Sequence, residues 1–79
     1  MTNDHRAMLE FARIWAPYGG AHPGDIFVGF GMSPAKFYHI IRRLLQTVHV
    51  RWQVPADERS LLEEIASRNI IDHHPNRRL

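Results

Sequence analysis

The 79-residue sequence contains no cysteine, which excludes a disulfide framework and a thiolate nucleophile or metal ligand. It also lacks any apolar run near the roughly 20 residues that a membrane-spanning helix requires. The amino-terminal residues are polar and include no signal-peptide core. We therefore expect a cytoplasmic protein with no membrane partner.

Motifs typical of enzymes are equally scarce. The sequence has no GxSxG elbow, and Gly29-Phe30-Gly31 is too short and apolar to be a nucleotide-binding loop. Six histidines are present, but they do not fall at the spacing of metal ligands on one helix face. We expect no enzyme, no metal site and no cofactor.

Helical periodicity dominates what is present. A first apolar stripe at i, i+3, i+4 and i+7 ends at Pro17, and the remaining stripes follow the same spacing. Four helices are expected, at about residues 4–16, 23–30, 34–47 and 56–68. The prediction is an all-α fold: a small four-helix domain over residues 1–72 followed by a flexible basic tail at 73–79.

Two assignments within this pattern have alternatives. Residues 24–29 are rich enough in β-formers for a short strand, but a lone strand would have no partner in this chain. Residues 48–54 alternate between apolar and polar, which fits either an extended segment or a frayed helix end. The aromatic residues on the helical stripes are expected to be core: Phe11, Trp15, Phe27, Phe30 and Phe37.

The stretch from Gly31 to Leu45 carries the most specific signal. Gly31 suits the left-handed end of a preceding helix, Ser33 suits an N-cap, and Pro34 suits the first helical position. At about 100° per residue, two opposite faces result. The apolar face holds Phe37, Ile40, Ile41, Leu44 and Val48, and the polar face holds Ala35, His39, Arg42, Arg43 and Gln46.

Charge is distributed unevenly along the chain. Residues 33–52 hold four basic side chains and no acidic one, whereas residues 53–72 hold five acidic and two basic side chains. A basic stretch beside an acidic helix indicates one surface that faces a polyanion rather than a uniformly basic protein.

The spacing around this stretch matches a helix-turn-helix at about residues 22–47. Gly31, an apolar residue and Ser33 form a turn that resembles that of sigma-factor region four, with Ile26 upstream and Phe37 downstream. The sequence departs from that pattern at Phe27, where a small residue usually faces the helix crossing. This resemblance implies a recognition helix at 34–47.

A closer resemblance extends over residues 8–45. Leu9-x-Phe11-x-Arg13-x-Trp15 comes first, then Phe30-Gly31-Met32-Ser33 and Phe37-Tyr38. This combination resembles a family of small actinobacterial helix-turn-helix proteins of unknown function. Ala16 stands where that family has a second aromatic residue, and the carboxyl-terminal helix is acidic where the family is basic.

These features predict a sequence-specific transcriptional regulator that binds double-stranded DNA, as a homodimer or with a partner protein. Phosphate contacts are expected from Ser33 and Lys36, and phosphate or guanine contacts from Arg42 and Arg43. The residues expected to face base edges are Ala35, Tyr38 and His39. Tyr38 flanks the apolar face of its helix, so half-buried packing is the alternative for it.

The alternative function is a protein–protein adaptor for RNA polymerase or a sigma factor. The low net charge and the acidic last helix favour it. In that case Trp52, Leu61 and Leu62 would form the docking patch. Trp52 itself fits either a core position or an exposed anchor for a partner.

Overall fold

Helices account for all the regular secondary structure in the computed structural model, which describes residues 3–72 of the chain and the side chains of residues 3–70. No strand occurs within that range, so the predicted all-α fold is confirmed. The elements are α1 (Asn3–Trp15), a 3₁₀ turn η1 (Ala16–Tyr18), α2 (Pro23–Phe30), α3 (Pro34–Leu45), α4 (Val48–Gln53) and α5 (Ala56–Asp72).

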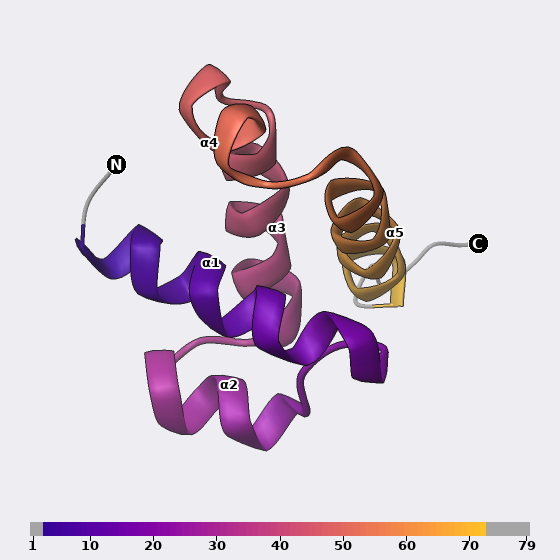
Figure 1. Ribbon diagram of the computed structural model, residues 1–79. Coiled ribbons are helices and arrows are strands. Elements are labelled where there is room, and N and C mark those ends of the chain that lie inside the picture. The colour runs from indigo at the N-terminus through magenta and orange to yellow at the C-terminus, as the bar shows by residue number, and fades with distance from the viewer. Residues whose placement is uncertain (1–2, 73–79) are drawn as a thin grey trace.

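Helix α3 lies at the centre of the fold (Figure 1). It packs most extensively against α5. Helix α2 lies near the amino-terminal end of α3 and α4 near its carboxyl-terminal end, while α1 runs across α3, with Phe11 beside Phe37 and His5 beside Leu44 and Thr47. Its predicted apolar face is confirmed for Phe37 and Ile41, which are fully buried, and in part for Ile40, which is half-buried. The prediction is wrong for Val48, which belongs to the next helix, α4 (Val48–Gln53), and is 70% exposed. The buried residues of this helix are Pro34, Phe37, Tyr38, Ile41, Leu44 and Leu45.

The predicted count of four helices is wrong, because residues 3–72 form five α-helices. The additional one is the segment after α3, for which the sequence left helix and extended chain open. Thr47 caps α4, because its Oγ1 accepts a hydrogen bond from the Val50 backbone N–H at 3.4 Å. The alternating apolar residues of this segment lie on two sides of the helix, and the two residues on each side are four positions apart. Val50 and Val54 are buried, whereas Val48 and Trp52 are 70% and 85% exposed. Helix α3 consequently ends at Leu45 rather than at residue 47.

Aromatic rings join α1 to α2 and α3. The Phe11 ring lies 5.3 Å from that of Phe30 and 5.8 Å from that of Phe37, both edge-on. The expectation that Phe27 is a core residue is wrong, because its side chain is 67% exposed and Ile26 takes the buried position on α2. The core of this small domain is therefore assembled around α3.

Some expectations lie outside the part that the structure describes. The basic tail predicted at 73–79 is one of them. Within residues 3–72, no helix has the length and apolar character needed to cross a membrane.

Candidate nucleic-acid interface

A three-residue turn connects α2 to α3 and sets the start of α3. Gly31 has a φ of +67°, and its N–H donates to the Phe27 carbonyl at 2.7 Å, which ends α2. Ser33 is extended, and its Oγ accepts a hydrogen bond from the Lys36 N–H at 3.2 Å. Both predicted roles are confirmed. The Ser33 hydroxyl keeps its own proton for donation, because the cap uses it as an acceptor.

The outward face of α3 is polar and basic. Its exposed side chains are those of Lys36, His39, Arg42, Arg43 and Gln46. Ala35, which was predicted on the same face, is half-buried. The predicted exposure of the two arginines, Lys36 and His39 is thus confirmed. Residues 33–52 contain no acid, so no side chain of this stretch itself offsets the positive charge of the face.

The cations of α3 form no ion pair with a described side chain. The one ion pair of the described side chains lies elsewhere, between Arg13 Nε of α1 and Glu58 Oε2 of α5 at 2.6 Å. It joins the first helix to the last, and both side chains are partly exposed. The cations of α3 therefore remain available to a bound anion.

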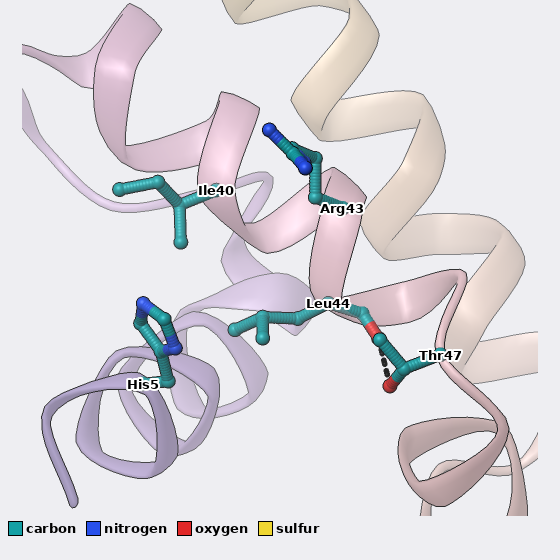
Figure 2. A pocket seen from close by; sticks show the side chains of 5 residues that line it. All are labelled: His5, Ile40, Arg43, Leu44 and Thr47. Atoms are coloured by element: carbon teal, nitrogen blue, oxygen red, sulfur yellow. Dashed lines mark hydrogen bonds between the residues drawn. The ribbon is translucent and has the colours of Figure 1, made fainter. Parts of the chain in front are cut away.

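A shallow hollow extends this face towards α1 (Figure 2). It is lined by His5 from α1 and, from α3 and the residues after it, by Ile40, Arg43, Leu44 and Thr47. Figure 2 shows Leu44 directed towards His5, while the Arg43 guanidinium points away from it. The Thr47 hydroxyl donates to the Leu44 carbonyl at 2.8 Å, which fixes the end of the hollow. No acidic side chain lines this hollow, and its floor is partly apolar, formed by Ile40 and Leu44.

Tyr38 does not belong to this face, and the prediction that it reaches base edges is wrong. Its side chain is fully buried, and its ring packs edge-on against Phe37 at 5.0 Å. The hydroxyl oxygen accepts a hydrogen bond from the Ala21 backbone N–H at 3.0 Å. The loop before α2 and the α5 residue Ile65 both approach the hydroxyl end of this ring, so tertiary contacts remove it from the surface.

Replacing Tyr38 with phenylalanine separates a structural role from a DNA-binding role. The variant leaves the Ala21 N–H without its acceptor, which should lower the free energy of unfolding by about 1–2 kcal/mol. Affinity for DNA should not change, because the hydroxyl is inaccessible. Thermal unfolding and a DNA titration measure the two effects. A variant of unchanged stability with weakened DNA binding would instead show that Tyr38 contributes to the DNA interface.

Tyr38 should also make the free energy of unfolding depend on pH, and Tyr38→Phe should remove that dependence. Burial raises the pKa of Tyr38, and the hydrogen bond from Ala21 offsets part of that rise. As the pH increases through about 10, the unfolded chain loses the Tyr38 proton before the folded chain does. The free energy of unfolding should then fall with pH, by at most about 1.4 kcal/mol per unit. Denaturant titrations between pH 9 and 11 should show this component in the wild type and its loss in Tyr38→Phe.

The described side chains offer no other obvious chemistry. They include no group of three or more His, Asp or Glu residues placed to hold a metal ion. The open basic face of α3 is therefore the strongest candidate site on the described surface.

Comparison with known proteins places the chain in a family. No curated protein and no solved structure matches it. A family model described as protein of unknown function (DUF3263) matches residues 1–62. The match includes α1, α2, the Gly31 turn, α3 and α4, and it ends within α5. Because it extends over most of the sequence, the chain belongs to the DUF3263 family of proteins of unknown function.

Proposed function

We propose that this protein is a DNA-binding transcriptional regulator that uses α3 as its recognition helix. One observation carries the proposal: the outward face of α3 exposes Lys36, Arg42 and Arg43 in a stretch without any acid. A duplex offers a dense row of phosphates, and their neutralisation supplies much of the affinity of DNA-binding proteins.

The packing of α3 suits this role. Six buried residues hold its inner side against α5 and the rest of the core, so its outer side is presented as a rigid surface. Arg42 and Arg43 lie about 100° apart around the helix and can reach phosphates on both sides of a groove. Between them His39 can hydrogen-bond to a base edge, and the Ala35 methyl can contact a thymine methyl.

The order of elements favours a helix-turn-helix. Helix α2 ends at Phe30 with Gly31 as its C-cap, and a turn of three residues separates it from α3, as the resemblance to sigma-factor region four implies. The departure at Phe27 does not obstruct this arrangement. Ile26 occupies the buried position on α2. Phe27 faces outward, so its bulky side chain does not enter the helix crossing. The motif in this proposal is therefore shifted by one residue along α2.

A homodimer completes the proposal. A single module of this size buries too little surface on DNA for tight specific binding. Two copies on an inverted repeat would place their recognition helices about one helical turn apart, at roughly 10 base pairs between half-site centres. Such a regulator would work at the nucleoid.

The test is selection of bound duplexes from a random pool, run at a low and a moderate salt concentration. We expect one enriched motif at both concentrations, built of two inverted half-sites, with affinity that falls as salt rises. A pool that shows neither retention nor an enriched motif at low salt would refute the proposal.

A further inference from the structure

A second surface of the molecule combines exposed apolar and basic side chains. It lies where α4 meets the beginning of α5, around a hollow of about 400 Å³. Four residues line the hollow: Val48, Arg51, Trp52 and Arg59. Trp52 is 85% exposed and Val48 is 70% exposed, although both are large apolar residues on a six-residue helix. We call this the Trp52 surface.

The fold presents the Trp52 surface in a defined geometry. Val50 and Val54 are almost fully buried, so they fix the inner side of α4 to the core. The Thr47 cap fixes the start of the helix. At the rim, Arg59 Nη1 of α5 donates to the Arg51 carbonyl of α4 at 3.5 Å, which ties the two helices together. Trp52 itself contacts no aromatic ring of residues 3–70.

The patch expected from the sequence differs from this one. Leu62 is completely buried in the core and cannot dock a partner, so that part of the prediction is wrong. Leu61 is 37% exposed but does not line the hollow. The neighbours of Trp52 are instead one apolar residue of its own helix and two arginines, a combination visible only once α4 and α5 are packed.

We propose that the Trp52 surface binds an acidic peptide segment of a partner protein. An apolar side chain of the segment would pack between Val48 and Trp52, and its carboxylates would pair with Arg51 and Arg59. Charge complementarity carries this choice, because the hollow is lined by two cations and no acid. Tryptophan and arginine are also the residues most enriched at binding hot spots.

One observation disfavours DNA as the occupant. DNA phosphates would satisfy the arginines but would leave Val48 and the tryptophan ring without an apolar partner. A second copy as the occupant is decided by the self-association measurement described below.

The test uses the full chain and a fluorescein-labelled peptide in which one leucine and one phenylalanine are set among six glutamates. Its control replaces all the glutamates with glutamine. Fluorescence anisotropy should show binding of the acidic peptide and at least tenfold weaker binding of the control. Trp52→Ala and the pair Arg51→Gln and Arg59→Gln should each weaken binding at least tenfold.

The matched control is the pair Arg42→Gln and Arg43→Gln, which removes two exposed cations that do not line the hollow. Circular dichroism of each variant verifies the fold. Equal binding of both peptides, or unchanged binding by Trp52→Ala, would overturn the proposal. Self-association that Trp52→Ala abolishes would assign the surface to a second copy, and weaker duplex binding by that variant would assign it to DNA. Either result would also overturn it, and neither depends on whether α3 binds DNA.

Discussion

Replacing Gly20 with alanine should destabilise the fold by about 3 kcal/mol, since strain and overpacking each contribute on the order of 1–2 kcal/mol. Gly20 has a φ of +116°, a conformation that L-residues rarely adopt. A Cβ at this position would lie 2.9 Å from Ile65 Cγ2 and 3.3 Å from the Tyr38 hydroxyl oxygen. Both neighbouring side chains are fully buried, so neither can move aside at low cost.

That loss is large for a chain of this length, whose total stability is on the order of 4–12 kcal/mol. The midpoint of thermal unfolding should fall by about 12–24 °C. If the variant loses its cooperative unfolding transition but keeps its helical circular dichroism signal, its core is loosened. This is expected at Gly20, because the loop before α2 closes there over Tyr38 and α5. Differential scanning calorimetry or circular dichroism measures the effect.

Two other glycines make a matched series. Gly19 has a φ of +89° but open space around its Cβ position, so Gly19→Ala isolates the backbone strain. Gly24 lies in α2 with open space around it, and Gly24→Ala should be neutral or stabilising by up to about 1 kcal/mol. If Gly20→Ala costs no more than Gly19→Ala, the close approach to Ile65 and Tyr38 has no energetic weight.

The parts of the fold that depend on local chemistry were predictable from sequence. Gly31 and Ser33 act on their own backbone neighbours, so their residue types alone indicate the turn and the cap. The two faces of α3 follow from its 3.6-residue period, which placed Phe37 and Ile41 inside and Arg42 outside. The candidate interface could therefore be outlined from sequence, apart from one residue.

That residue, Tyr38, shows what periodicity cannot decide. It lies about 100° around the helix from Phe37, at the border between the two faces. Its burial depends on the loop at Gly20 and on Ile65 of α5, which are distant in sequence. The choice between Ile26 and Phe27 on α2 is similar, because adjacent apolar residues leave the buried side to be set by the partner helix.

The double variant Arg42→Gln and Arg43→Gln should weaken binding to duplex DNA by about tenfold to a hundredfold at 0.1 M salt. Each arginine that contacts a phosphate displaces condensed counterions, and its loss removes about 0.9 from the slope of log affinity against log salt. Removing two contacts should therefore reduce that slope by nearly 2. Anisotropy titrations of a labelled duplex at several salt concentrations measure both quantities.

The matched control is the pair Arg51→Gln and Arg59→Gln, which makes the same change in net charge on the Trp52 surface. If α3 is the DNA-binding element, this pair should keep nearly the full salt slope, because only long-range attraction is reduced. Arg42 and Arg43 are exposed and have no ion-pair partner among residues 3–70, so their removal should leave thermal stability unchanged. Equal losses of affinity and slope in both pairs would mean that net charge rather than the face of α3 drives binding. An unchanged slope in the Arg42 and Arg43 variant would exclude α3 as the phosphate-contacting helix.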